Sequence, residues 1–355
     1  MVDNTLIKHG GSQADWEDVS APNPQKTPRS IRITTPTDSY VTVYPQAITF
    51  AEEQEGVFWP STEVDVEKDL HDLKVNLTEA ELHGVTTVLK LFTKYEVQIG
   101  EDYWLGYVMK NFPRPEIQRM ASMFGMMELN THATFYNKIN EVLGLDTDEF
   151  YTAYIDDPVL NGRMEWIGKA LKEAPDTDVG RYVTVAISSI LEGAVLYSNF
   201  AFLKHFQAEG KNKLVNLVAG IDFSVRDENI HSLAGAWLAK TISDEAGLSG
   251  SERVEADLLI AEATVQIRSH EYQIIDMIFE KGSIRGITAE QMKHFIDSRL
   301  DLCLEQLGIP SLYNPTYNPI KSWFYRDIQL SSFNDIFQKQ GNEYNRNWRE
   351  GAFTW

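Results

Sequence analysis

The stretch Leu191–Phe206, LEGAVLYSNFAFLKHF, places Glu192 inside a segment that otherwise has the composition of a protein core. A carboxylate that is ionised and buried costs several kcal/mol unless it is paired with a cation or bound to a metal ion. A single glutamate of this kind is more often a surface or helix-terminal residue. Its meaning therefore depends on the other acidic residues that occur inside apolar helical segments.

The next helical segment contains a glutamate and a histidine at a spacing that suits a shared ligand. In Val225–His231, VRDENIH, Glu228 and His231 are three residues apart. Side chains at this spacing project from one face of a helix and can contact the same ion. A carboxylate oxygen beside an imidazole nitrogen suits iron or manganese. One such pair occurs by chance often enough to be weak support when it stands alone.

The first half of the chain repeats this arrangement. Glu96 lies within the apolar segment LKLFTKYEVQIG, and MFGMMELNTHATFY carries Glu128 and His132. The order is a single Glu, a Glu/His pair, a single Glu and a second Glu/His pair, on four successive long helical segments. This is the ligand set of the ferritin-like dimetal carboxylate proteins. We therefore predict an all-α fold, a ferritin-like helical bundle with a dimetal carboxylate centre.

The first Glu/His pair departs from the usual spacing, because Glu128 and His132 are four residues apart. Two other pairs, Glu67/His71 and Glu79/His83, share this spacing, and we expect them on solvated helix faces. A spacing of four still places both side chains on one face, and a single π-bulge would restore the ligand geometry. We therefore keep Glu128 as a predicted ligand.

The pattern along the chain predicts one large helical body between two polar ends. We expect an N-terminal extension over residues 1–45, a ferritin-like dimetal domain over 46–325 and a C-terminal tail over 326–355. Residues Thr78–Glu81 read as the capping box of a helix that continues to about Met109. The other expected helices are 116–143, 159–173, 178–208, 213–243, 253–280 and 289–306. The segment VTVYPQAITF, residues 41–50, is expected to hold a short strand.

Composition excludes several classes of protein. The chain has 355 residues, with 52 Asp and Glu against 32 Lys and Arg, and a net charge of −20 opposes nucleic-acid binding through a basic face. Its single cysteine, Cys303, cannot form an intramolecular disulfide or a cysteine-rich zinc site, and fits a reducing, cytoplasmic location. No apolar run approaches the roughly 20 residues that span a bilayer, and the first residues lack the features of a signal peptide. We expect neither a membrane nor a nucleic acid as partner.

With these motifs the chain resembles the small, radical-generating subunit of class I ribonucleotide reductase, from about Phe58 to the C-terminus. The resemblance is carried by FWPSTEVDVEKD, HATFYNKI, LEGAVLYSNFAF and VRDENIH. It implies that two metal ions are held by six residues: Glu96, Glu128, His132, Glu192, Glu228 and His231.

The resemblance also implies a route for a radical. Tyr136, four residues after His132, matches the position of the family's stable tyrosyl radical. Trp59 matches the tryptophan that relays the electron, and Asp227 matches the aspartate that links this tryptophan to a metal-bound histidine. Tyr344 matches the tyrosine of the C-terminal tail that passes the radical to the large subunit, on which the last residues would dock.

One ligand differs from the common family pattern and bears on the metal. Most members have Asp at the first ligand position, where this chain has Glu96. The longer ligand is similar to that of the manganese/iron subgroup, whose members usually lack the radical tyrosine, whereas this chain keeps Tyr136. We expect two metal ions activated by O2, with Fe/Fe first and Mn/Fe or Mn/Mn as alternatives.

The function that the resemblance implies is that of the small subunit of ribonucleoside-diphosphate reductase, an oxidoreductase. The chain would work as a homodimer with a large catalytic subunit, to which it passes a radical for the reduction of ribonucleotides to deoxyribonucleotides. Because nucleotide reduction needs several cysteines, the lone Cys303 places the thiol chemistry on the partner. Two alternatives remain at this point, another ferritin-like dimetal oxidase or oxygenase, and a metal-storage protein.

Overall fold

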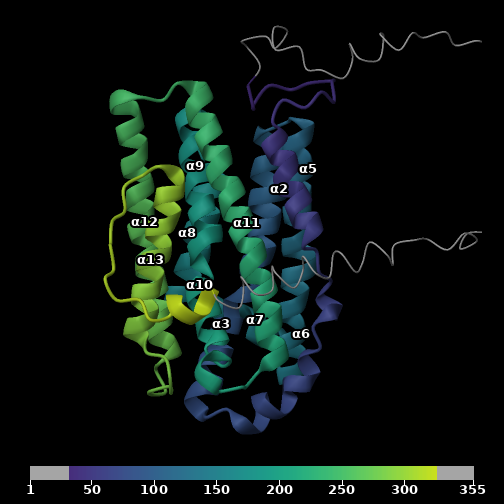
Figure 1. Cartoon of the computed structure of the whole chain (residues 1–355), viewed down its shortest axis with the longest axis vertical. Helices are drawn as coiled ribbons and strands as arrows, with labels where there is room; N and C mark the ends of the chain where they lie inside the picture. Colours follow the sequence, from purple (N-terminus) through teal and green to yellow (C-terminus); the bar gives the residue numbers. More distant parts are fainter. Residues whose placement is uncertain (1–31, 326–355) are drawn as a thin grey trace, which may run out of the picture.

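The structure, a computed structural model, describes residues 32–325. Within that range the chain is helical and forms no strand, apart from one isolated bridge between Ile284 and Ile287. The long helices lie roughly side by side and form an elongated bundle (Figure 1). The predicted all-α fold is therefore confirmed for the described residues.

The helices agree closely with those expected from the apolar periodicity. The predicted capping box is present, because Glu81 N donates to Thr78 Oγ1 at 3.2 Å and Thr78 N donates to Glu81 Oε2 at 2.8 Å. The long helices are α2 (Pro45–Gly56), α3 (Glu79–Gln98), α5 (Pro115–Met126), α6 (Ala133–Leu143), α8 (Pro158–Lys172), α9 (Asp178–Ile190), α10 (Tyr197–Lys204), α11 (Val215–Ala246), α12 (Gly250–Ile278) and α13 (Ala289–Leu307). Short helices include α4 (Met109–Asn111) and α7 (Asp148–Thr152).

The strand expected over residues 41–50 is wrong, because helix α2 begins at Pro45. Proline suits the first turn of a helix, where its missing N–H would have no partner and its fixed φ is already helical. The spacing of Ala47, Phe50 and Ala51 then buries one face of α2, which packs against α5. The residues VTVY precede this proline, and Val41 is exposed.

Three of the long helices contain π-helical turns. They are η4 (Ile99–Val108), which continues α3, η5 (Met127–His132), which joins α5 to α6, and η7 (Leu191–Val195), which lies between α9 and α10. A π-helical turn contains an extra residue, so it changes which side chains share a helix face. A π-helical turn of the kind that would restore the ligand geometry of Glu128 and His132 is present as η5.

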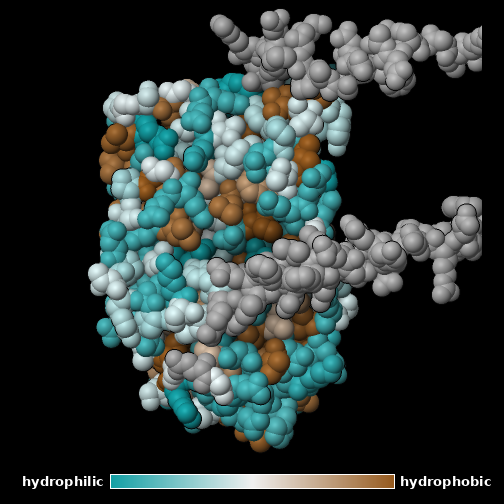
Figure 2. Space-filling view, in the orientation of Figure 1, coloured by the Kyte–Doolittle hydropathy of each residue, from teal (hydrophilic) through white to brown (hydrophobic). Residues whose placement is uncertain are grey.

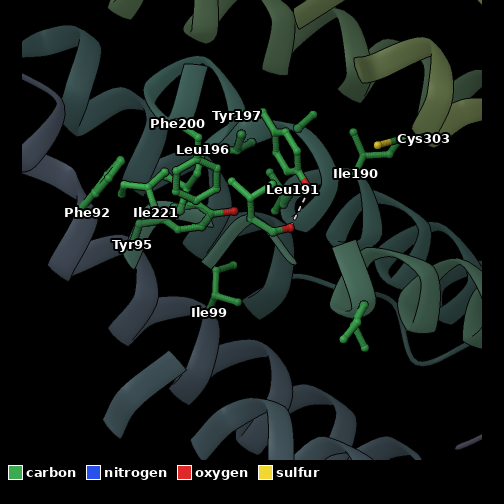
Figure 3. Packing of buried hydrophobic residues seen from close by; sticks show 14 of the residues in the cluster. Phe92, Tyr95, Ile99, Ile190, Leu191, Leu196, Tyr197, Phe200, Ile221 and Cys303 are labelled. Atoms are coloured by element: carbon green, nitrogen blue, oxygen red, sulfur yellow. Dashed lines mark hydrogen bonds between the residues drawn. The ribbon is translucent and has the colours of Figure 1, made fainter. Parts of the chain in front are cut away.

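The most apolar segment, Asp178–Lys204, is a core element. It is long and apolar enough to cross a membrane, which the sequence reasoning did not expect, but 94% of its most apolar window is buried inside the protein. It packs against α11 and α12, and several of its side chains pack with those of α3 (Figure 3). The face of the protein seen in Figure 2 is largely hydrophilic, with smaller apolar areas between the polar ones.

The ends of the described range lie against the bundle. Near the N-terminal end Ile33 is buried, and its N–H donates to Glu245 Oε2 on α11 at 2.8 Å. Near the other end Phe324 is buried against Phe295 of α13, with ring centroids 4.7 Å apart. The domain boundaries at residues 45 and 325 remain predictions.

Candidate metal centre

The six predicted ligands come together in the middle of the bundle, and all six are buried, none of them more than 2% exposed. Glu96 comes from α3, Glu192 from η7, and the two Glu/His pairs come from η5 and α11. They form two overlapping groups whose ligand atoms all lie within 4.8 Å of one another: Glu96, Glu128, His132 and Glu228 in the first, and Glu128, Glu192, Glu228 and His231 in the second. Glu128 and Glu228 belong to both groups, so they could bridge two ions.

Local helix geometry explains why each pair can share an ion. On the regular helix α11, the three-residue spacing of Glu228 and His231 places both side chains on one face. Glu128 and His132 are four residues apart, but they lie in the wider π-helical turn η5. The extra residue is therefore accommodated by the backbone, and both pairs face the same centre.

Both imidazoles turn Nδ1 toward the carboxylates. His132 Nδ1 lies 3.0 Å from Glu128 Oε2 and 3.2 Å from Glu228 Oε1, and His231 Nδ1 lies 2.6 Å from Glu128 Oε1. The opposite nitrogen of each ring has its own partner. His132 Nε2 lies 3.1 Å from Asp227 Oδ2, and His231 Nε2 lies 3.2 Å from Gln54 Oε1. Partners of this kind fix the orientation of a metal-binding imidazole.

The donor set fits transition-metal ions. Within residues 32–325 the ion-pair partners of the four glutamates are the two imidazoles, and no lysine or arginine neutralises them. Both carboxylate oxygens of Glu96 and Oε2 of Glu192 are buried and have no hydrogen-bond partner among the described residues. Two divalent cations would satisfy these oxygens and balance the charge, and mixed carboxylate and imidazole donors suit iron or manganese.

The pKa values of the cluster reflect its crowded negative charge. Burial, and then the charges of neighbouring glutamates, raise the pKa of Glu96 and of Glu192 well above the usual range. Burial acts in the same direction on Glu128, but His132 and His231 outweigh it and lower the pKa of this carboxyl. Burial would lower the pKa of His231, yet the charge of Glu128 raises it to about 9. Without a cation, these shifts favour the protonated forms of Glu96, Glu192 and His231.

A hydrogen-bond chain leads from the centre to a buried tryptophan. Trp59 Nε1 donates to Asp227 Oδ2 at 2.8 Å, and the same oxygen lies 3.1 Å from His132 Nε2. Trp59 is 2% exposed and packs against His132, with ring centroids 5.9 Å apart. The structure thus joins the three side chains that the sequence resemblance connected.

Tyr136 lies one helical turn after His132, on α6, and is fully buried. Its ring packs against Phe92 with centroids 4.4 Å apart. Burial, and then the charge of Glu96, raise the pKa of the phenol well above its ordinary value. The tyrosine is thus held in an apolar pocket beside the first predicted ligand. Tyr344 lies outside the described residues.

Sequence reasoning missed two residues that contact the predicted ligands. Trp104 Nε1 donates to Glu192 Oε1 at 2.6 Å, and Gln54 lies against His231. Trp104 gave no clear signal, because it lies in the π-helical turns of η4, which change the side chains that share a face with Glu96. Gln54 gave no signal either, since α2 reaches the centre only through the tertiary fold.

Residues 38–319 match the family described as ribonucleotide reductase, small chain. The chain belongs to the ribonucleotide reductase small-chain family. In this family a dimetal centre generates a radical, so the small chain is one component of an oxidoreductase. The match covers all six predicted ligands together with Trp59, Tyr136 and Asp227, whereas Tyr344 lies beyond it.

Related proteins have the same description. The small chain is 25% identical to a probable ribonucleoside-diphosphate reductase small subunit of Invertebrate iridescent virus 3, over 88% of this chain and 85% of the viral one. It is 22% identical to ribonucleoside-diphosphate reductase small chain 1 of Saccharomyces cerevisiae, over 82% of this chain and 69% of the yeast one.

Solved structures show the same fold. A putative class I ribonucleotide reductase from Bacillus halodurans is 21% identical with a TM-score of 0.72, covering 80% of this chain and 100% of the other. The dimanganese(II) NrdF of Streptococcus sanguinis is 20% identical with a TM-score of 0.69, covering 81% of this chain and 97% of the other. The predicted ferritin-like bundle is confirmed.

Proposed function

We propose that this small chain is the radical-generating subunit of a ribonucleoside-diphosphate reductase, with its radical at Tyr136. The proposal rests above all on the hydrogen-bond chain from His132 through Asp227 to Trp59. A metal-storage protein has no use for a buried indole that is joined to a ligand histidine. A protein that exports an oxidising equivalent needs such a connection.

Each residue of the centre has a distinct task in this proposal. The six ligands would hold two metal ions, which when bound supply oxidation by dioxygen. Tyr136 would give up an electron and the proton of its hydroxyl, and the negative charge of Glu96 acts on this phenol. The apolar surroundings, including Phe92, keep water away from the oxidised ring.

The oxidising equivalent would leave the centre through Trp59. Its indole N–H faces Asp227 Oδ2, so the proton can move along this hydrogen bond when the ring loses an electron, and no positive charge is left buried. Tyr344 would carry the radical onward to a large catalytic subunit. Cys303 is buried, and as the chain's single cysteine it leaves the reducing thiols to that partner.

The metal and the assembly are parts of the same proposal. Fe/Fe is the first expectation, and Mn/Fe and Mn/Mn suit the same donors. We infer a homodimer in the cytoplasm, with ribonucleoside diphosphates reduced on the large subunit. The charge of −20 is unfavourable for binding nucleic acid directly.

The proposal is tested by replacing Tyr136 with phenylalanine. Y136F should bind two metal ions and yet lose both the tyrosyl EPR signal after exposure to O2 and nucleotide reduction with the large subunit. Y182F is the matched control, because Tyr182 is also buried but donates to Asp257, away from the centre. If Y136F keeps both the signal and the reduction, the radical does not reside at Tyr136.

Truncation after residue 335 separates this function from that of another dimetal oxidase or oxygenase. The truncated chain should still form the tyrosyl signal but fail to support nucleotide reduction. An oxidase that turns over a small molecule without a partner would keep its full activity.

A further inference from the structure

Arg299 of α13 is a buried cation whose partners are neutral. The residue is 2% exposed, and within residues 32–325 its hydrogen bonds go to a carbonyl oxygen and a hydroxyl, not to a carboxylate. Its Nε and Nη2 both donate to the carbonyl oxygen of Gly193, at 2.9 and 2.7 Å, and its Nη1 donates to the hydroxyl of Tyr325 at 3.1 Å. Burying a charge without a counter-charge is costly. The hydrogen bonds of this guanidinium to Gly193 and Tyr325 must offset that cost.

The first of these groups belongs to the ligand segment η7. Gly193 directly follows Glu192, and two N–H groups on one carbonyl oxygen fix the plane of that peptide. The contact between the two elements is close, because a Cβ on Gly193 would lie 2.5 Å from Cys303 Sγ of α13. Helix α13 therefore supports the backbone from which Glu192 reaches the centre, although it contributes no predicted ligand.

A second support lies on the other side of the same segment. Ser232 Oγ donates to the carbonyl oxygen of Ser189 at 2.9 Å, and Ser189 Oγ donates to that of Ser232 at 2.8 Å. These bonds join the backbone next to His231 on α11 to the end of α9. The rigid backbone around Glu192 thus depends on α11 and on Arg299.

The Arg299 guanidinium also contacts side chains near the end of the described range, directly at Tyr325 and through Tyr197 at Phe324. Arg299 Cζ is 3.8 Å from the ring centroid of Tyr197, whose hydroxyl donates to the carbonyl oxygen of Val225 at 3.3 Å. The Tyr197 ring also packs against Phe324, with centroids 5.9 Å apart. Figure 3 shows Tyr197 beside Leu191, with Cys303 on the neighbouring helix. Arg299 therefore joins η7 to the end of the described chain.

We propose that Arg299 is a positioning residue that sets Glu192 for metal binding and couples η7 to Tyr325. This inference rests on the proposed role of Glu192 as a ligand. Because coupling between two sites is reciprocal, metal binding at Glu192 stabilises the contact of Arg299 with Tyr325. Any partner that displaces Tyr325 then loosens the ligand segment. The interaction links the metal centre to the chain segment that precedes the proposed tail.

Metal binding tests the positioning role without any radical chemistry. Equilibrium dialysis of the metal-free, full-length protein against Mn²⁺ should show two bound ions in the wild type. In R299M one of the two should bind about 10- to 100-fold more weakly, the usual effect of removing a partner that orients a ligand. R299K, which keeps one cationic donor, should recover part of this loss. Two ions bound to R299M with wild-type affinity would overturn the proposal.

A matched variant separates positioning from general stability. Arg268 of α12 makes a bidentate ion pair with Asp297, at 2.6 and 3.0 Å. Asp297 lies on α13, the helix that carries Arg299. R268M should lower the melting temperature of the protein but leave the affinity for both Mn²⁺ ions unchanged. An equal loss of Mn²⁺ affinity in R268M and R299M would show that Arg299 acts through stability alone.

Hydrogen exchange tests the coupling. Mn²⁺ should slow amide exchange over residues 320–325 in the wild type and have a much smaller effect in Y325F, which keeps both bonds to Gly193. An equal effect of Mn²⁺ in the two proteins would overturn the coupling. None of these measurements involves Tyr136, O2 or the large subunit. A wild-type protein that binds Mn²⁺ as described but forms no radical would refute the proposed function and leave this inference standing.

Discussion

At the scale of single residues, the predicted ligand that depends most visibly on a neighbour is Glu192. Its Oε1 accepts the Trp104 indole N–H at 2.6 Å, while its Oε2 is buried without a hydrogen-bond partner among the described residues. One oxygen is thus fixed by the protein and the other is left for an ion. This division determines how the carboxylate faces the centre.

Replacement of Trp104 with phenylalanine should weaken metal binding. W104F keeps an aromatic ring for packing against Phe124, whose centroid is 4.8 Å away, but removes the donor to Glu192. The pKa of Glu192, already raised by burial, should rise further, and the affinity for one Mn²⁺ ion should fall about 10-fold or more. W166F, on α8 and outside the centre, is the control in the same dialysis experiment. Unchanged affinity in W104F would show that this hydrogen bond does not orient the ligand.

At the scale of elements, π-helical turns and direct backbone contacts position the ligands. η5 accommodates the four-residue pair, and η7 presents Glu192 where α9, α11 and α13 meet. Gly193 permits this approach, since a Cβ there would lie 2.4 Å from Ser232 Oγ and 2.5 Å from Cys303 Sγ. Both neighbours are short side chains, so relief of the clash would require movement of the helices.

Two glycine substitutions should therefore have opposite effects. G193A should reduce the free energy of unfolding by about 1–3 kcal/mol through overpacking. G162A, on α8, meets nothing within 4 Å, and should increase the free energy of unfolding by about 0.5–1 kcal/mol, because alanine is the better helix former. Urea denaturation of the metal-free proteins measures both. Equal effects of the two changes would mean that η7 has room to relax.

The elements themselves were largely predictable from the sequence. Apolar periodicity gave the long helices, and the unusual placement of Glu96, Glu192 and Glu228 inside them gave the centre, because burial restricts where a carboxylate can be tolerated. The helix at Pro45 was missed because residues 41–50 were interpreted as a strand, although proline suits the first turn of a helix. The roles of Gln54 and Arg299 depend on contacts between helices far apart in sequence, for which a single sequence carries no periodic signal.

At the scale of the whole molecule, the shifted pKa values of the centre make the stability of the metal-free fold depend on pH. His231, with its pKa raised to about 9, and His132, with its pKa also raised, bind protons in the folded state that they release on unfolding near pH 7. A histidine with a raised pKa contributes stability that is complete below its unfolded pKa, about 6.5, and is lost as the pH rises through the folded value. Glu96 and Glu192, whose pKa values are also raised, act in the same direction. The pKa values of His205 and His270 are lowered to about 3 and about 4, so these residues affect stability mainly below pH 6.5.

The metal-free protein should therefore melt at a progressively lower temperature between pH 7 and pH 9. Metal ions replace the protons of the cluster, so binding releases protons and becomes more favourable as the pH rises. The increase in melting temperature caused by a fixed excess of Mn²⁺ should then be larger at pH 8 than at pH 6, because ligand binding stabilises the folded state in proportion to the logarithm of its affinity. Scanning calorimetry with and without Mn²⁺ across this range measures both trends. In the metal-free protein E192Q serves as the control, since a neutral side chain removes one of the titrating groups and should make the pH dependence of the melting temperature less steep. An increment that shrinks with rising pH would mean that the buried carboxylates and imidazoles are not where the ions bind.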